Sequence, residues 1–391
     1  MVKRLMIEKA DRLYHLPPTL EEFLPRWDRQ GRLLKREVID LARLNWPTED
    51  NPSDQTGDLQ DPEKMLETLR EKIAEWYQKR FSTRIKSDKE IFIGSRLREI
   101  LNLTALAFFN PGDILLIPDP GIWHYRTAAV LASAETVRYN LTERHGFQPL
   151  PETISENLSR LARGIFINNP HNPTGATVDS DSLGVLLKLA GRENLLIILD
   201  QAFDGLTGEN EPASLFSLPG GRKVALELYS LAYNCAAPGP ALGFAIGQTS
   251  LIRGLNRVAS LFGMHPTALD MAYALQALAN ADENRKTLRR KIIANRALMD
   301  RLCSRVRLLP ASQTAGPFYW AKLPGRLQSR RYCRQLYMRC GILSVPGTAF
   351  GENGEGFVRF SLLQSEDKYL RALEAANRFT SLSGRKERQN G

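Results

Sequence analysis

The sequence is poor in cysteine and histidine and lacks any long apolar run. Its 391 residues include only 4 Cys and 5 His, and no two cysteines form a C-x-x-C pair, so neither a disulfide framework nor a metal site is indicated. No stretch of about 18 apolar residues occurs, and a membrane span is therefore not expected. The first residues carry charges every few positions and lack the apolar segment of a secretory signal. We expect a cytoplasmic protein.

The composition that remains is that of an ordinary globular protein. Apolar residues make up 43% and charged residues 25% of the chain, which excludes disordered, collagen-like and disulfide-rich classes. Lys and Arg outnumber Asp and Glu by 53 to 43, a formal net charge of +10. Such an excess can serve a polyanionic partner. The basic residues are dispersed, however, without interleaved aromatics or a nucleic-acid module, so nucleic-acid binding is not favoured.

Short apolar runs alternate with helical patterns over most of the chain. Continuous apolar runs such as 195–200 are typical of strands buried on both faces of a parallel sheet. The alternation predicts an α/β doubly wound domain that binds ligands at the carboxyl ends of its strands. We expect strands at 91–95, 114–118, 136–139, 164–168, 195–200, 224–231 and 243–247, and helices at 62–81, 96–109, 123–134 and 180–189.

The pattern changes near residue 290. We expect a large α/β domain over 46–289 and a smaller α+β domain built from 1–45 and 290–391. A polar loop at 47–62 and a basic tail at 383–391 have too few apolar residues to pack. The smaller domain is expected to contain helices at 282–302, 329–340 and 365–380 and strands at 306–309, 318–323 and 357–362.

Four segments occur in the order found in one known family. They are IFIGSRLREILNLTALAFFNPGDILLIPDPG (91–121), INNPHNPTG (167–175), IILDQAFDGL (197–206) and GILSVPGTAFGENGEGFVRFSLL (341–363). Together they resemble the class I/II aminotransferases of pyridoxal-phosphate (PLP) fold type I, and most closely the aspartate and LL-diaminopimelate aminotransferase branch. The resemblance implies an aspartate aminotransferase-like fold with a mainly parallel central sheet, flanking helices and a smaller α+β domain. It also implies PLP as cofactor and a dimer.

Several residues match the positions that serve the cofactor in this family. Gly94, Ser95 and Arg96 end a strand and open a helix, where free backbone N–H groups favour a phosphate, although the same triplet also suits a plain turn. The resemblance gives Asn172 a hydrogen bond to the cofactor's ring hydroxyl. It pairs Asp200 with the protonated pyridine nitrogen, which keeps the ring an electron sink, and a carboxylate at the end of an apolar strand is costly to bury without such a cation.

Two further residues fit the family pattern. Ser230 matches the serine that precedes the lysine block. Arg359, in FVRFS, matches the arginine that grips the substrate α-carboxylate through two hydrogen bonds. An arginine with a purely structural role on a strand is the alternative for Arg359.

The chain departs from the family where the catalytic lysine is expected. The flanking Ser-Leu, Pro-Gly and Leu-Gly pairs of 230–243 fix the register without gaps. Tyr233 then stands at the lysine position, and Ala241 at the position of the phosphate-binding arginine. Transamination needs a primary amine to hold the cofactor and move the proton. A phenol has no nitrogen, and its pKa of about 10 makes it a poor base at neutral pH.

Other positions depart in the same direction. Phe203 stands where the family has a tyrosine that hydrogen-bonds the ring hydroxyl, and Ile122 stands where an aromatic ring stacks on the cofactor. The loop at 47–62 contains no tyrosine of the kind that a partner subunit sends to the phosphate. No substitute lysine is obvious, because Lys223 precedes its strand by a whole element and Lys322 belongs to the other domain.

We therefore expect an aminotransferase-family protein that does not carry out covalent PLP transamination. It is interpreted as a pseudoenzyme, or as a regulatory or partner subunit, whose cleft binds a small carboxylate or amino-acid ligand through Arg359. A homodimer is expected, with a heterodimer that includes an authentic aminotransferase as a variant. The side chain of Tyr233 should point into the cleft near Asp200 and Asn172.

Two alternatives stay open. The first is an enzyme of different chemistry that uses Tyr233, paired with Asp200, on non-covalently bound PLP or pyridoxamine phosphate or on another ligand, in which case no PLP need bind. The second is an active amino-acid aminotransferase that uses an unanticipated lysine.

Overall fold

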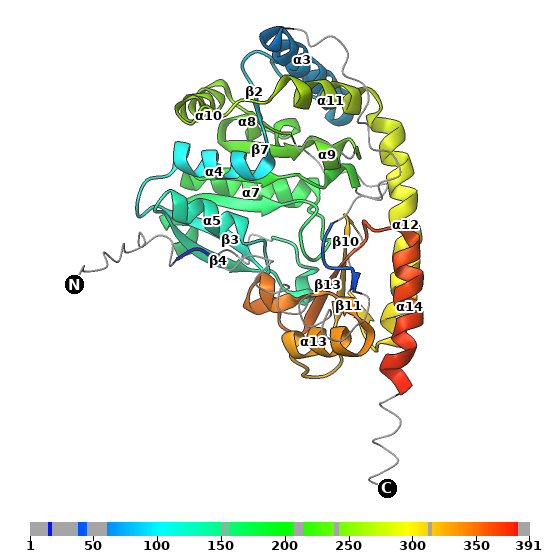
Figure 1. The fold of residues 1–391 in the computed structure, drawn as a ribbon. Helices are drawn as coiled ribbons and strands as arrows, with labels where there is room; N and C mark the ends of the chain where they lie inside the picture. The colour runs from blue at the N-terminus through cyan, green and yellow to red at the C-terminus, as the bar shows by residue number, and fades with distance from the viewer. Residues whose placement is uncertain are drawn as a thin grey trace, which may run out of the picture.

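A computed structural model describes most of the chain (Figure 1). The described residues are 15–17, 38–44, 61–149, 154, 156–206, 214–237, 242–311 and 315–381. Ala241, the basic tail and all but the last two residues of the expected polar loop lie outside them.

A seven-stranded sheet forms the centre of the larger part of the molecule (Figure 1). Its strand order is β2-β8-β7-β6-β5-β3-β4. Every neighbouring pair is parallel except the two that involve β8, so the prediction of a mainly parallel central sheet is confirmed. The strands are β2 (Ile91–Gly94), β3 (Ile114–Asp119), β4 (Glu135–Asn140), β5 (Ala162–Asn168), β6 (Leu196–Asp200), β7 (Ala225–Ser230) and β8 (Gly243–Gly247).

Helices cover both faces of this sheet. Alternate residues of a strand point to opposite faces, so Ile197 and Leu199 join one apolar cluster while Ile198 joins another. The first cluster includes residues of α3 (Pro62–Phe81), α7 (Ser180–Glu193) and α11 (Ala268–Ala279). The second includes residues of α4 (Leu97–Phe108), α5 (His124–Leu131) and α10 (Thr249–Leu261). Shorter helices are α6 (Glu156–Leu161), α8 (Gly221–Val224) and α9 (Leu231–Asn234).

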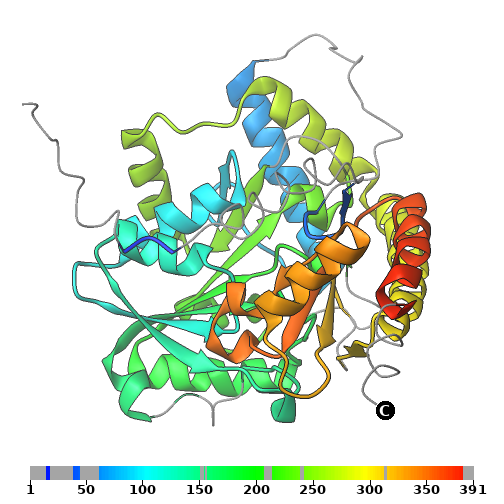
Figure 2. The same cartoon turned by 60° about the horizontal axis from the view of Figure 1, so that its bottom comes forward.

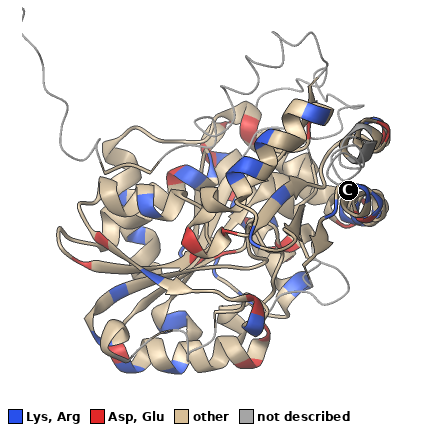
Figure 3. Ribbon diagram, turned by 90° about the horizontal axis from the view of Figure 1, so that it is seen from below, with Lys and Arg blue, Asp and Glu red and all other residues tan. Residues whose placement is uncertain are grey.

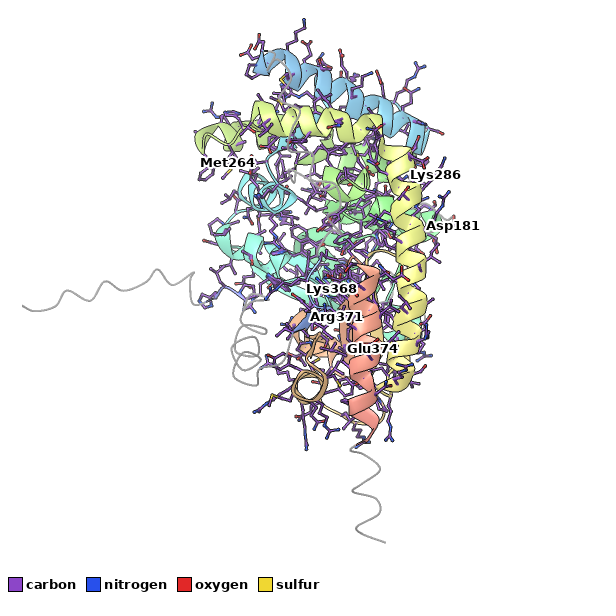
Figure 4. All side chains as sticks on the ribbon, turned by 45° about the vertical axis from the view of Figure 1, so that its right-hand side comes forward. Asp181, Met264, Lys286, Lys368, Arg371 and Glu374 are labelled. Atoms are coloured by element: carbon purple, nitrogen blue, oxygen red, sulfur yellow. The ribbon has the colours of Figure 1, made fainter. Side chains whose placement is uncertain are left out.

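A second, antiparallel sheet is built mainly from the C-terminal part of the chain (Figure 2). Its order is β12-β13-β10-β9, and α12, α13 and α14 pack around it. The two long helices α12 and α14 lie side by side along one edge of the molecule (Figure 4). The elements are β9 (Leu309–Pro310), β10 (Phe318–Lys322), β12 (Val345–Pro346), β13 (Phe357–Ser361), α12 (Ala281–Arg305), α13 (Ser329–Cys340) and α14 (Glu366–Ser381).

An N-terminal segment is attached to this C-terminal part. The short strand β1 (Ile39–Asp40) pairs in parallel with β11 (Ile342–Leu343). The Leu41 carbonyl accepts a hydrogen bond from the Ser361 N–H at 2.7 Å. Residues more than 300 positions apart are thus brought to one place. The expected domain boundaries at 45/46 and 289/290 stay a prediction.

The expected strand at 306–309 is wrong over most of its length. Helix α12 continues to Arg305, and the Val306 N–H bonds to the Leu302 carbonyl at 3.0 Å to end it. Val306 is fully buried in the core beneath the second sheet, so the apolar character that suggested a strand belongs to a helix end. Only Leu309–Pro310 pairs with β10.

Candidate functional site

Polar side chains converge at the carboxyl ends of β5 and β6. Asp200 is the last residue of β6 and is 2% exposed. The Asn168 side-chain amide donates to the Asp200 carbonyl at 3.0 Å, and the Asn168 side-chain oxygen accepts from the Asn172 N–H at 2.7 Å. The loop after β5 is therefore fixed against the end of β6, at the sheet edge where the sequence predicts a ligand site.

Two groups hold the Asp200 carboxylate. The Tyr125 hydroxyl donates to Oδ2 at 2.8 Å, and the Ala202 N–H donates to Oδ1 at 3.0 Å. Tyr125 is itself fully buried and stacks on Phe166, with ring centroids 4.8 Å apart. Burial raises the pKa of Asp200 to about 6, although both hydrogen bonds act to lower it. No Lys, Arg or His of the described residues pairs with this carboxylate, so it is suited to a cationic ligand group.

Arg359 lies on β13 of the second sheet and is 4% exposed. Its guanidinium donates to the Asn172 side-chain oxygen at 2.9 Å and to the Ala42 carbonyl at 3.1 Å. The rings of Phe318 and Phe350 lie 4.3 and 4.8 Å from its central carbon. Its Nε has no hydrogen-bond partner, and no carboxylate of the described residues pairs with it.

A buried guanidinium without a counterion is costly. Burial lowers the pKa of Arg359 to about 9, an effect that Tyr233 opposes, and the group stays charged at neutral pH. Such an arginine, with N–H groups left over, is suited to a ligand carboxylate. The bond to Asn172 connects this carboxylate site, through Asn168, to the end of β6 that carries Asp200.

The segment Gly94-Ser95-Arg96 joins β2 to α4, as expected. Arg96 is the N-cap residue, and no side chain caps the first turn of α4. A Cβ atom on Gly243 would lie 2.8 Å from the Leu97 nitrogen, so only glycine allows β8 to approach the start of this helix. The free N–H groups of the first turn favour an anion here.

Tyr233 follows β7 directly, on the short helix α9. Its ring centroid lies 4.9 Å from that of Phe203, which in turn contacts Phe318 edge-on at 5.3 Å. Burial raises the pKa of the Tyr233 phenol, and the guanidinium groups of Arg98 and Arg359 oppose this shift. The phenol therefore belongs to the side of the site that holds Arg359.

The hydrogen-bonded pair of Asp200 and Tyr233 considered in the sequence analysis is not formed. Asp200 is bonded to Tyr125 and to Ala202 instead, because the side chain of Tyr125 reaches the end of β6 from α5. Ser230 ends β7, buried, and its N–H donates to the Asn234 side-chain oxygen at 2.7 Å.

Sequence reasoning missed several groups around Arg359. The Ala42 carbonyl, Phe318 and Phe350 come from three separate segments and meet only through the second sheet and its loops. Neither lysine weighed as a replacement reaches the site. Lys322 pairs with Glu143, and Lys223 lies on α8, which precedes β7, whereas Tyr233 follows it.

Other kinds of site find no support in the described part of the chain. No cluster of three or more His, Cys, Asp or Glu side chains there could hold a metal ion. Among the helices described, none is both long and apolar enough to cross a membrane. Basic residues are distributed over several elements, with acidic residues among them (Figure 3).

Comparison with known proteins gives a consistent result. The family description "Aminotransferase class I and II" matches residues 53–375. The chain belongs to this family. It is 30% identical to an LL-diaminopimelate aminotransferase of Halothermothrix orenii, over 94% of this chain and 97% of that protein. An enzyme of the same name from Aquifex aeolicus is 29% identical over 96% and 100%.

Solved structures agree with this assignment. A probable N-succinyldiaminopimelate aminotransferase from Thermus thermophilus superposes with a TM-score of 0.82 at 26% identity, covering 92% of this chain and 99% of that one. The fold is that of the PLP fold type I aminotransferases. When bound, PLP supplies a ring that withdraws electrons from the carbon next to a carboxylate.

Several described residues of this aminotransferase-family chain are suited to bind the ring and the phosphate of that cofactor. The buried Asp200 carboxylate suits a protonated ring nitrogen, and the uncapped start of α4 suits the phosphate. Asn172 is bonded to Arg359 and, through Asn168, to the end of β6 that carries Asp200, and it would meet the ring hydroxyl.

The raised pKa of Asp200 leads to a stability prediction. An aspartate whose pKa rises from 3.8 to about 6 on folding destabilises the fold once it is ionised, and this cost is fully present above pH 6. Asp200→Asn should therefore stabilise the ligand-free protein at pH 8 by about 2–3 kcal/mol, since two pKa units correspond to about 2.7 kcal/mol. The gain should shrink as the pH falls from 6 toward 4, as measured by the difference in thermal midpoint.

Tyr125→Phe provides a control of opposite sign. It removes a hydrogen bond that favours the ionised carboxylate, so it should lower the thermal midpoint at pH 8. A pH-independent effect of Asp200→Asn would contradict the prediction.

Proposed function

We propose that this protein is a non-transaminating member of the aminotransferase family, a pseudoenzyme or regulatory subunit whose cleft binds a small carboxylate or amino-acid ligand. The observation that carries the proposal is the buried Arg359, which has no counterion among the described residues. It supplies a carboxylate site that needs no covalent cofactor.

The chemistry of Tyr233 supports the absence of transamination. A phenol cannot form the covalent bond to PLP that a lysine amine forms. The raised pKa of Tyr233 leaves even less of it as phenolate, the form that could accept a proton, at neutral pH, which argues against the alternative of an enzyme that uses this phenol as a base. In the described part of the chain no lysine forms a hydrogen bond or ion pair with Asp200, Asn172 or Arg359.

Turnover and trapping test this proposal directly. The purified protein, supplied with PLP, should transfer no amino group from L-glutamate or L-aspartate to a 2-oxo acid. Borohydride reduction followed by peptide mass spectrometry should find no pyridoxyl group on a residue of the cleft. Tyr233→Lys is the matched variant, because it restores an amine on α9 and should become labelled. Turnover by the unmodified protein, or labelling of any of its cleft lysines, would overturn the proposal.

Carboxylate binding should depend on Arg359. We expect Arg359→Met to weaken the binding of 2-oxoglutarate, pyruvate or phenylpyruvate by about 10- to 100-fold, the effect of losing a charge-assisted hydrogen bond. Methionine keeps most of the packing against Phe318 and Phe350 but loses the hydrogen bonds to Asn172 and to the Ala42 carbonyl, so the thermal midpoint is measured to show that the variant is folded. Isothermal titration calorimetry measures the affinity. Arg334→Met, on the exposed face of α13, is the control, and equal affinities in the two variants would contradict the prediction.

An apolar face on α10 and α11 supports the further proposal of a homodimer. Helix α11 carries a single charged residue, Asp270, yet only Met271 and Ala274 are buried. Leu269 is 45% exposed, and at the end of α10 Leu261 is 73% and Phe262 58% exposed. Figure 4 places Met264 on the loop that joins these two helices. Contiguous exposed apolar side chains of this kind are typical of interfaces, and a second copy of the chain would cover them.

Light scattering after size-exclusion chromatography tests the dimer. Leu269→Glu should shift the protein toward the monomer, because it buries a charge in an apolar interface. Leu161→Glu, at a 64% exposed position on α6, should leave the dimer intact. A monomeric unmodified protein would overturn the homodimer. The heterodimer with an authentic aminotransferase stays a prediction.

A further inference from the structure

The buried carboxylate of Asp119, which is not among the residues that match the cofactor site, connects the central sheet to a loop of the second sheet. Asp119 ends β3 of the central sheet and is 3% exposed. Its Oδ1 accepts the Asn353 N–H at 3.0 Å, and its Oδ2 accepts the Glu352 N–H at 3.2 Å. The Asn353 side-chain amide returns a bond to the Asp119 carbonyl at 3.2 Å. One carboxylate thus binds two successive backbone N–H groups of a loop that lies 233 residues further along the chain.

The loop is shaped to receive this carboxylate. Gly351 has φ 130°, a conformation that side chains rarely adopt. A Cβ atom on Gly351 would lie 2.2 Å from Asp119 Oδ1, so only glycine permits the approach. Burial raises the pKa of Asp119, while the N–H groups of Asn353 and Glu352 and the charge of Arg138 oppose the shift.

The same loop carries the ring that covers Arg359. The Phe350 carbonyl accepts the Gly121 N–H at 2.7 Å, two residues after Asp119. The Phe350 ring lies 4.8 Å from the Arg359 guanidinium and 6.0 Å from the ring of Trp320. With Phe318 at 4.3 Å, Phe350 provides an aromatic wall for the guanidinium. The position of Phe350 in this wall therefore depends on contacts made at the end of β3, whereas Phe318 is held on β10.

We propose that Asp119 is a positioning residue of the carboxylate site. It binds the N–H groups of Glu352 and Asn353 and so holds Phe350 over Arg359, although it does not contact Arg359 itself. Its carboxylate accepts both N–H groups at once, whereas an asparagine would turn an amide N–H₂ toward one of them. The importance of Asp119 for ligand binding rests on the proposed carboxylate function. The proposal that Asp119 controls access to Arg359 does not depend on that function.

Chemical labelling of arginine measures that access without a ligand. Phenylglyoxal reacts with accessible guanidinium groups, and peptide mass spectrometry reports the rate at each arginine. Asp119→Asn should raise the labelling rate at Arg359 by about tenfold, the shift expected on losing roughly one charged hydrogen bond. The internal reference is Arg80, whose side chain is 2% exposed in an ion pair with Asp204. Its rate should not change unless the whole fold opens.

Two variants separate the possible causes. Gly351→Ala places a Cβ atom too close to the Asp119 carboxylate, so it should displace the loop and also raise the labelling of Arg359. Arg138→Gln removes two ion pairs at 3.3 Å, with Asp119 and with the exposed side chain of Glu352, made by a side chain that is 42% exposed, and should have little effect because the backbone N–H contacts remain. An equal effect of Arg138→Gln would overturn the role given to those contacts.

The outcomes of the test are distinct. An unchanged rate at Arg359 in Asp119→Asn, or an equal rise at Arg80, overturns the proposal. Titration of the same variant with 2-oxoglutarate should show affinity falling together with the rise in labelling. If the unmodified protein binds no carboxylate, the proposed function fails, and the labelling rates still decide whether Asp119 positions Phe350.

Discussion

The buried guanidinium of Arg359 is the constraint on which the arrangement of the site depends. A charge taken out of water must be hydrogen-bonded or paired. Here the Asn172 side chain belongs to the central sheet's loop, whereas the Ala42 carbonyl belongs to the segment that joins the second sheet. The guanidinium of Arg359 keeps both hydrogen bonds only if the loop of the central sheet and the N-terminal segment stay in fixed positions relative to each other. The N–H groups still available, including Nε, are then free for a ligand.

The remaining charged groups of the site follow a similar logic. Asp200 is buried with two donors and no cation, and Asp119 is buried with two backbone N–H groups of a distant loop. An aromatic series of Tyr233, Phe203 and Phe318 leads toward Arg359. The result is a site with one fixed cation and one fixed anion, which suits a ligand that carries both charges.

Much of the fold could be predicted because its signals are local. The continuous apolar run at 195–200 and the helix at 62–81 are both present as expected, since strand burial and helical periodicity are written in neighbouring residues. The strand expected at 306–309 failed because a buried Val306 at a helix end has the same apolar character as a strand residue. Helices α10 and α11 were not expected. In α11 the apolar residues are spread around the helix and only Met271 and Ala274 are buried, so its sequence does not show one distinct apolar face.

The sequence by itself determined which chemical groups are available. It placed Asp200, Asn172 and Arg359 in family motifs and put a phenol rather than an amine at position 233, because identity and order are properties of the chain alone. Only the tertiary structure decided the pairing. Tyr125, not Tyr233, binds Asp200, and Asp119 binds a loop 233 residues away. Hydrogen bonds and ring contacts act over a few ångströms in space, and separation along the sequence does not reveal which groups come that close.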